Sequence, residues 1–174
     1  MRDGYILRRL GPADLALARG LNAMFGEAFG EADVYGGDPP SDAYLEALLA
    51  KAHIVVLAAV SGDEVVGGLV AYELDKLERA RPEIYVYDLA VAERHRRRGI
   101  ATALIGRCRE IAAQRGASVI FVQADRADAP AVSLYERIGR REEVFHYDIE
   151  VRQAEPMSAR PSRTGGGLYD SRSD

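Results

Sequence analysis

A strand pattern that runs through a basic turn into an amphipathic helix constrains this chain more than any other feature. Residues 83–92 read EIYVYDLAVA, an apolar and alternating pattern typical of a strand. After the turn, apolar residues recur at helical spacing until Gly116 ends the pattern: Ile100, Leu104, Cys108 and Ile111. This unit predicts a mixed α/β (α+β) fold in which a strand leads the chain into the first turn of a helix.

Further elements are expected on both sides of this unit. Apolar runs predict strands at residues 4–10, 53–60, 65–74, 118–123 and 142–151. Helices are expected in three places: after Asp14 with Leu17, Leu21 and Phe25 on one side, after Ser41, and from Asp128 to Gly139. Residues 30–40 predict a loop, and Gly67-Gly68 indicates a bulge or a close contact within a strand.

The turn itself has the composition of an anion site. Residues 96–101 read RRRGIA and fit the pattern Arg/Gln-x-x-Gly-x-Gly/Ala. The first turn of a helix offers unpaired N–H groups and partial positive charge, and Gly99 lets a phosphate approach the backbone closely. The small Ala101 keeps that approach open, and the Thr102 hydroxyl adds a donor. A basic turn before an ordinary helix is the alternative, but the elements on either side favour a pyrophosphate site.

These segments resemble the GNAT superfamily of N-acetyltransferases over roughly residues 4–151. YDLAVAERHRRRGIATALI is similar to the superfamily's acetyl-CoA motif, and DAPAVSLYERIGRREE is similar to its downstream helix. EIYVYDLAV, the run Gln123-Ala124-Asp125 and REEVFHYDIE resemble aminoglycoside 3-N-acetyltransferases of type I. The resemblance implies a GNAT fold: a mixed central sheet of about six to seven strands, about four flanking helices, and splayed central strands that hold acetyl-CoA.

The resemblance also implies which residues contact acetyl-CoA. The pantetheine arm pairs with the backbone of Leu89, Ala90 and Val91, and Thr102 lies close to the pyrophosphate. The pyrophosphate itself rests on the backbone of Arg96, Arg97, Arg98, Gly99, Ile100 and Ala101. Asp128 stands where many members carry an Asn near the pantetheine, which leaves its contact open, although it can still cap a helix. Tyr135 matches the family tyrosine that hydrogen-bonds the departing thiolate.

Acetyl transfer to an amine requires a base, because an aliphatic ammonium has a pKa of about 10. Asp88, near the end of the central strand, is the first candidate, and a structural carboxylate is the alternative. Glu83 lies on the opposite face of a regular strand unless a bulge intervenes. We expect Tyr135 to act as general acid rather than as a core tyrosine, and the Leu89 N–H to polarise the carbonyl. Cys108 predicts a buried structural thiol, and therefore direct transfer in a ternary complex.

Charge is segregated along the chain. Six acidic residues and no basic one lie between Arg19 and Lys51, and four acidic residues lie between Arg141 and Arg152. These two stretches together carry a charge of −10. Because the net charge of the whole chain is −4, the rest of the chain carries +6. A groove lined by carboxylates would attract a small polycationic amine, whereas solvated surface is the alternative for each residue. The candidates for substrate binding are Glu31, Asp33, Tyr35, Tyr87, Asp88, Asp125, Glu142, Glu143 and Asp148.

The function expected from the resemblance is acetyl-CoA-dependent acetylation of the 3-amino group of aminoglycoside antibiotics, which confers resistance. A GNAT enzyme for another amine, such as a polyamine or a protein, is one alternative. A non-catalytic acetyl-CoA-binding module is the other, and the presence of Asp88 and Tyr135 argues against it.

The remaining expectations concern organisation. One cysteine and three scattered histidines predict no metal site. The small excess of positive charge predicts no nucleic-acid partner, and the lack of a signal peptide or a long uncharged apolar run predicts a cytoplasmic protein with no membrane contact. Alternation in residues 142–151 favours a homodimer. Residues 1–151 are expected to form the acetyltransferase domain, and 152–174 a disordered tail.

Overall fold

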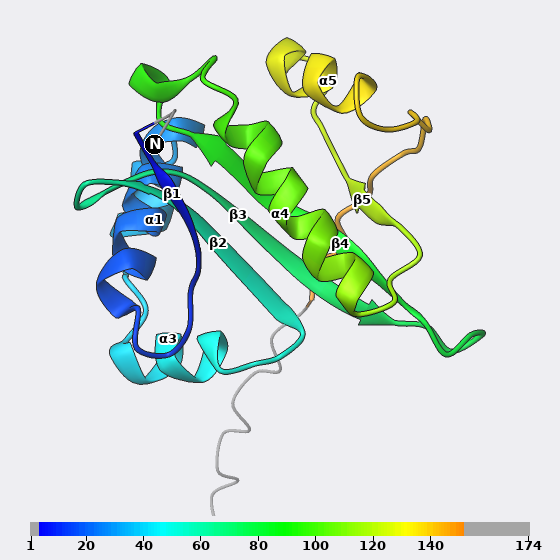
Figure 1. The fold of residues 1–174 in the computed structure, drawn as a ribbon, viewed down its shortest axis with the longest axis horizontal. Coiled ribbons are helices and arrows are strands. Elements are labelled where there is room, and N and C mark those ends of the chain that lie inside the picture. The colour runs from blue at the N-terminus through cyan, green and yellow to red at the C-terminus, as the bar shows by residue number, and fades with distance from the viewer. Residues whose placement is uncertain (1–3, 152–174) are drawn as a thin grey trace, which may run out of the picture. The chain divides into compact units, whose positions relative to one another are not determined.

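The computed structural model describes residues 4–151, and a sheet of five strands lies at its centre (Figure 1). The strands follow one another across the sheet in chain order: β1 (Ile6–Arg9), β2 (Ile54–Ser61), β3 (Glu64–Asp75), β4 (Pro82–Val91) and β5 (Ile120–Val122). The first four are antiparallel, and β5 pairs with β4 in parallel. The chain returns to this parallel position through a helix, as a parallel connection requires.

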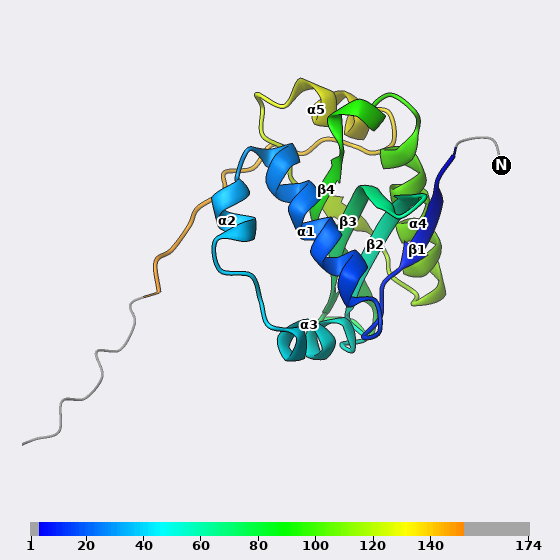
Figure 2. The ribbon, with the colours of Figure 1, turned by 90° about the vertical axis from the view of Figure 1, so that its left-hand side faces the viewer.

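Helices cover both faces of the sheet. They are α1 (Leu15–Phe29), α2 (Ala32–Gly36), α3 (Asp42–Leu49), α4 (Ile100–Gln114) and α5 (Ala129–Glu136), with a 3₁₀ turn at Glu93–His95. Figure 2 shows α1 and α4 on opposite sides of the strands. Each side has its own core, one around Phe25 and Leu21 of α1 and the other around Leu104 and Cys108 of α4. No helix within residues 4–151 is long and apolar enough to cross a membrane.

The helix ends largely follow the sequence signals. The Ser41 hydroxyl accepts from the Tyr44 N–H at 3.2 Å and caps α3, and Asp128 accepts from the Ala131 N–H at 3.0 Å and caps α5. Asp14 precedes α1 but does not cap it, because its carboxylate accepts from the Gly11 N–H at 2.8 Å and from Arg8.

Three predictions about elements are wrong. Residues 30–40 contain α2, so the described helices number five rather than about four. Residues 142–151 form no strand, and the described sheet has five strands rather than six to seven. A strand requires a partner and a face to bury, whereas the apolar side chains from Val144 to Val151 are all exposed. Contacts divide the chain into two units, one ending at Arg140 and one beginning at Arg141.

The predicted tail at residues 152–174 lies outside the described residues.

Gly67 and Gly68 in β3 lie where both helix layers press on the sheet. A Cβ at Gly67 would lie 2.9 Å from Ile100 Cγ2 at the start of α4, and a Cβ at Gly68 would collide with Leu21 of α1. The pairing register also shifts between Ala59 and Val60 of β2, which places a bulge in β3 beside these two glycines. Both the close contact and the bulge expected at these glycines are therefore present.

Candidate functional site

A bulge in β4 decides which way its acidic side chains face. Ala71 of β3 pairs with Val86, and Val70 pairs with Asp88, so Tyr87 is the additional residue. Before the bulge Ile84 and Val86 face the α4 side, whereas after it Leu89 and Val91 do so. Asp88 therefore faces the α1 side, as Glu83 does. The sequence predicted opposite faces for these two acids unless a bulge lay between them, and the bulge is present. Glu83 itself lies 3.6 Å from the Lys76 ammonium.

The strands β4 and β5 part beyond the bulge. They pair only at Ile84, Tyr85 and Val86, while β4 continues to Val91 (Figure 1). The Ala92 N–H donates to the Val66 carbonyl at 3.0 Å, and antiparallel bonding alternates. Ala90 and Asp88 thus direct their backbone groups to β3, whereas Leu89 and Val91 direct theirs toward the gap beside β5. This edge has the backbone donors and acceptors expected for pairing with a pantetheine arm.

The turn before α4 has the conformation of an anion cradle. Gly99 takes a left-handed conformation (φ 78°), as does Arg97 (φ 63°), and α4 begins at Ile100. The N-cap residue Gly99 makes no side-chain cap hydrogen bond, so it leaves the first N–H groups of α4 to other acceptors. Arg96, Arg97 and Arg98 are exposed around it, and Arg96 Nε donates to the Val91 carbonyl at 3.2 Å. Nothing lies within 4 Å of a Cβ built on Gly99, so its backbone is open to approach.

A carboxylate cluster lies on the other side of the bulge. Asp88 is partly buried, and it interacts electrostatically with Tyr35 of α2 and with Glu31. Burial raises the pKa of Asp88, the Tyr35 hydroxyl lowers it, and the nearby Glu31 charge raises it. Burial and the charges of Asp88 and Glu31 raise the pKa of Tyr35 to about 12. The predicted residues Glu31, Tyr35 and Asp88, from α2 and its flank and from β4, are thus brought together.

An aromatic row borders this cluster: the predicted Tyr87 belongs to it, whereas its other members, Tyr72, Tyr85 and Phe121, were missed by sequence reasoning. The rings of Tyr72 and Tyr87 meet edge to face at 5.8 Å, as do those of Tyr85 and Tyr87, and Phe121 stacks on Tyr85 at 5.0 Å. Burial, followed by the charge of Asp88, raises the pKa of Tyr72. The signal for Tyr72 was its place in VVGGLVAYEL, where it shares a face with Val70, the residue that pairs with Asp88.

Tyr135 and Cys108 both belong to the α4 side. Tyr135 of α5 packs partly buried against that core, and burial followed by the Asp128 charge raises its pKa to about 12. The phenol therefore remains protonated at neutral pH. Cys108 is 1% exposed, and burial raises its pKa to about 11, which fits the predicted structural thiol and not a nucleophile.

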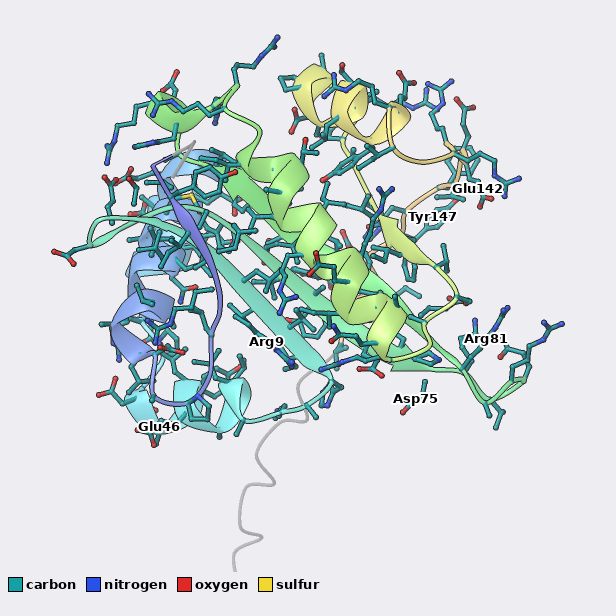
Figure 3. The ribbon with its side chains drawn as sticks, viewed as in Figure 1. Arg9, Glu46, Asp75, Arg81, Glu142 and Tyr147 are labelled. Atoms are coloured by element: carbon teal, nitrogen blue, oxygen red, sulfur yellow. The ribbon has the colours of Figure 1, made fainter. Side chains whose placement is uncertain are left out.

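The other acidic residues predicted to bind substrate are exposed. Asp33 is exposed on α2, and Asp125 accepts from the Ala127 N–H at 3.0 Å within its own turn. Glu142, Glu143 and Asp148 are exposed in the second unit, where Asp148 lies 3.0 Å from His146. Glu46, labelled in Figure 3, is exposed on α3, and Asp42 pairs with Arg19 at 2.5 Å. Much of the acidic stretch 27–46 is therefore solvated or paired surface.

Two other features fall outside the cluster. A surface hollow of about 350 Å³ is lined by residues of α1, α2 and Pro39-Pro40, with Tyr35 on one wall and no residue of β4. Within residues 4–151, no three His, Cys, Asp or Glu side chains gather closely enough to hold a metal ion.

The splayed strand, the basic turn and α4 together match a known family. The model of the Acetyltransferase (GNAT) family matches residues 21–139, which include all of these elements. This chain belongs to the GNAT acetyltransferase family. Members of the family generally use acetyl-CoA as acetyl donor. The basic turn before α4 and the part of β4 that no longer pairs with β5 are features that suit such a donor.

Two solved structures and one curated protein are similar to this chain. An aminoglycoside acetyltransferase from an uncultured soil metagenomic sample is 53% identical, with a TM-score of 0.83 over 85% of this chain and 99% of that one. A second, from the same kind of source and in complex with sisomicin, is 28% identical with a TM-score of 0.79, covering 86% and 97%. The curated streptothricin acetyltransferase of Streptomyces lavendulae is 27% identical over 79% of this chain and 63% of its own length. The chain thus spans less than two thirds of that curated relative.

Proposed function

We propose that this GNAT acetyltransferase transfers the acetyl group of acetyl-CoA to the 3-amino group of aminoglycosides. The observation that carries the proposal is the half-buried Asp88 beside the edge of β4, with Tyr35 and Glu31 next to it. A carboxylate of raised pKa at this edge is suited to take a proton from an ammonium, and the neighbouring acid attracts polycations. The 53% identity to an aminoglycoside acetyltransferase supports the choice of substrate.

The proposed chemistry assigns one proton or hydrogen bond to each group. Asp88 takes a proton from the acceptor ammonium, directly or through water, which leaves a neutral amine. The Leu89 N–H, directed away from β3, donates to the thioester carbonyl as the C–N bond forms. Tyr135, with a pKa of about 12, donates a hydrogen bond to the thiolate as the C–S bond breaks. The nitrogen loses its second proton, the thiolate gains one, and Asp88 returns one to solvent.

In this proposal the acetyl-CoA pyrophosphate rests on the turn at Arg96–Ala101, with Thr102 close by. The pantetheine arm follows Leu89 and Val91, whose backbone groups face the gap, and passes Ala90 and Asp128. Acetyl-CoA supplies the activated acyl group. The transfer is direct, because the buried Cys108 thiol offers no acyl acceptor.

A thiol-release assay with acetyl-CoA tests the proposal. The acceptors are gentamicin, sisomicin, kanamycin, spermidine and a lysine peptide. We expect turnover on gentamicin and sisomicin, with NMR of the product placing the acetyl on the 3-amino nitrogen. Turnover on spermidine or the peptide alone would replace the substrate assignment, acetylation at another amine would overturn the regiochemistry, and acetyl-CoA binding without turnover on any amine would favour a binding module.

A further inference from the structure

We propose that the aromatic row is a platform for the ring face of the acceptor, and that Tyr87 makes the enzyme prefer cyclic amino sugars to linear amines. The inference rests on the proposed function and deepens it, because it names the surface that recognises the acceptor ring. The sequence placed Tyr87 among the substrate-binding candidates without giving its ring a role.

The row is built by the register of three neighbouring strands. Tyr72 of β3 pairs with Tyr85 of β4, and Tyr85 pairs with Phe121 of β5 (Figure 1). Direct cross-strand partners share one face of a sheet, so the three rings lie side by side. The rings of Tyr85 and Phe121 stack with 15° between their planes, and the Tyr85 hydroxyl donates to Gln123 Oε1 at 3.1 Å. The platform is therefore held by the sheet and not by a loop.

The bulge in β4 adds a fourth ring and turns it to the same face as the base. The Tyr87 ring meets those of Tyr72 and Tyr85 edge to face, each at 5.8 Å, so it lies on the α1 side of the sheet. Asp88, the next residue, faces that side as well. Consecutive residues of a regular strand face opposite sides, so only the bulge allows this pair. An aromatic ring and a partly buried carboxylate thus lie next to each other on one face.

The exposure of the row suits a ring that carries positive charge. Tyr87 is 64% exposed although two rings hold it, and Phe121 is 38% exposed. The aminoglycoside ring with the 3-amino group presents C–H bonds on its faces and ammonium groups at its rim. Aromatic carbon packs against such faces and attracts cations, and the charges of Asp88 and Glu31 favour the same rim. A linear amine has the ammonium groups but no rigid face.

The test is the Tyr87→Leu variant, which keeps an apolar side chain and removes the ring. We expect KM for gentamicin to rise about three- to tenfold, the scale of one aromatic contact. The kcat and the KM for acetyl-CoA should stay near the parental values, because binding that is equal in the ground and transition states affects KM alone. Tyr87→Phe restores a ring and should restore most of the affinity. An equal loss of affinity for gentamicin and spermidine would overturn the preference for rings.

Tyr44→Leu is the matched control. Tyr44 lies on α3 and is 57% exposed, which is close to the exposure of Tyr87. It removes a tyrosine ring of similar accessibility, and we expect KM for gentamicin to remain that of the parent. A similar rise in KM in both variants would show a general surface effect and overturn the proposal.

NMR of the tyrosine-labelled enzyme with sisomicin reads the contact without any turnover. With the Tyr87 signals assigned through Tyr87→Phe, we expect NOEs between its ring protons and ring C–H protons of sisomicin. NOEs to residues 142–151 instead, or a changed sedimentation coefficient in Tyr87→Leu, would assign the row to that segment or to a second copy of the chain and overturn the proposal.

The failure of this inference is distinct from that of the proposed function. A parent enzyme that neither binds nor acetylates aminoglycosides would refute both. A parent that acetylates them, with no Tyr87 NOE to the ligand and a parental KM in Tyr87→Leu, would refute the platform alone.

Discussion

The turn before α4 lies only a few residues after Asp88 in the chain, yet this turn and the carboxylate cluster around Asp88 are built in opposite ways. The turn is a continuous segment whose donors are backbone N–H groups and whose surrounding side chains are exposed. The cluster is assembled from β4 and from residues at and just before α2, and its central group is partly buried. The difference teaches that the turn depends on backbone conformation, whereas the cluster depends on individual side chains.

The largest effect is expected from replacing Asp88, the proposed base in the cluster. We expect Asp88→Asn to lower kcat about 10²- to 10⁴-fold, the usual contribution of a general base, with acetyl-CoA binding unchanged by calorimetry. The carboxyl has a raised pKa in the folded protein, so its ionisation lowers stability as pH rises through that raised value. Asp88→Asn should therefore raise the melting temperature at pH 7. A lower melting temperature with parental kcat would show a structural carboxylate instead.

Tyr135→Phe tests the α4 side with a smaller expected loss. Removing a single donor that stabilises developing charge costs about 10²-fold in kcat. Stopped-flow turnover with a saturating amine measures this loss, and equilibrium binding of acetyl-CoA serves as the internal control because the ring packing is kept. Parental turnover would remove Tyr135 as the group that stabilises the thiolate.

Gly99→Ala tests the turn before α4, where the backbone conformation is expected to matter most. An alanine at φ 78° costs about 1–2 kcal/mol of stability and displaces the first turn of α4. Gly62→Ala is matched, because Gly62 has φ 60° and also nothing within 4 Å of an added Cβ. We expect both variants to melt earlier, and only Gly99→Ala to weaken acetyl-CoA binding. Equal affinities in the two variants would mean that the turn holds no pyrophosphate.

The exposed arginines should have the smallest effects. Arg98→Ala is expected to weaken acetyl-CoA binding only about two- to fivefold, because exposed charge pairs contribute little, and the loss should shrink at high salt. Arg94 is the control, since it pairs with Glu64 at the start of β3. A large, salt-insensitive loss in Arg98→Ala would show that a side chain, and not the backbone, is the main anion ligand.

Much of the fold followed from local signals in the sequence. The strand at 83–92, the helix from Ile100 and the caps at Ser41 and Asp128 are each specified by neighbouring residues, and they lie where predicted. The strand at 142–151 failed because alternation gives only a tendency, and pairing decides whether a strand forms. The helix α2 was predicted as loop because its segment contains several glycines, one of which, Gly36, lies inside the helix.

The candidate site was also predictable only in part, because one part is contiguous in the sequence and the other is not. The turn at Arg96–Ala101 is contiguous, so its backbone role was predictable from the sequence. The side on which Asp88 faces depends on the bulge at Tyr87, and its neighbours come from α2 and β3, elements distant in the chain. No spacing in the sequence connects Tyr35 or Tyr72 with Asp88, so those relationships required the tertiary structure.

The paired glycines of β3 have a consequence for how this enzyme evolves. Ile100, the first residue of α4, rests against Gly67 from one face, and Leu21 of α1 rests against Gly68 from the other. The donor side and the acceptor side of the proposed reaction are thus separated by the thickness of one bare strand. A side chain gained at Gly67 would press on α4, whereas one gained at Gly68 would press on α1. In the proposed reaction, mutations at these two neighbouring positions would therefore affect the donor side and the acceptor side separately.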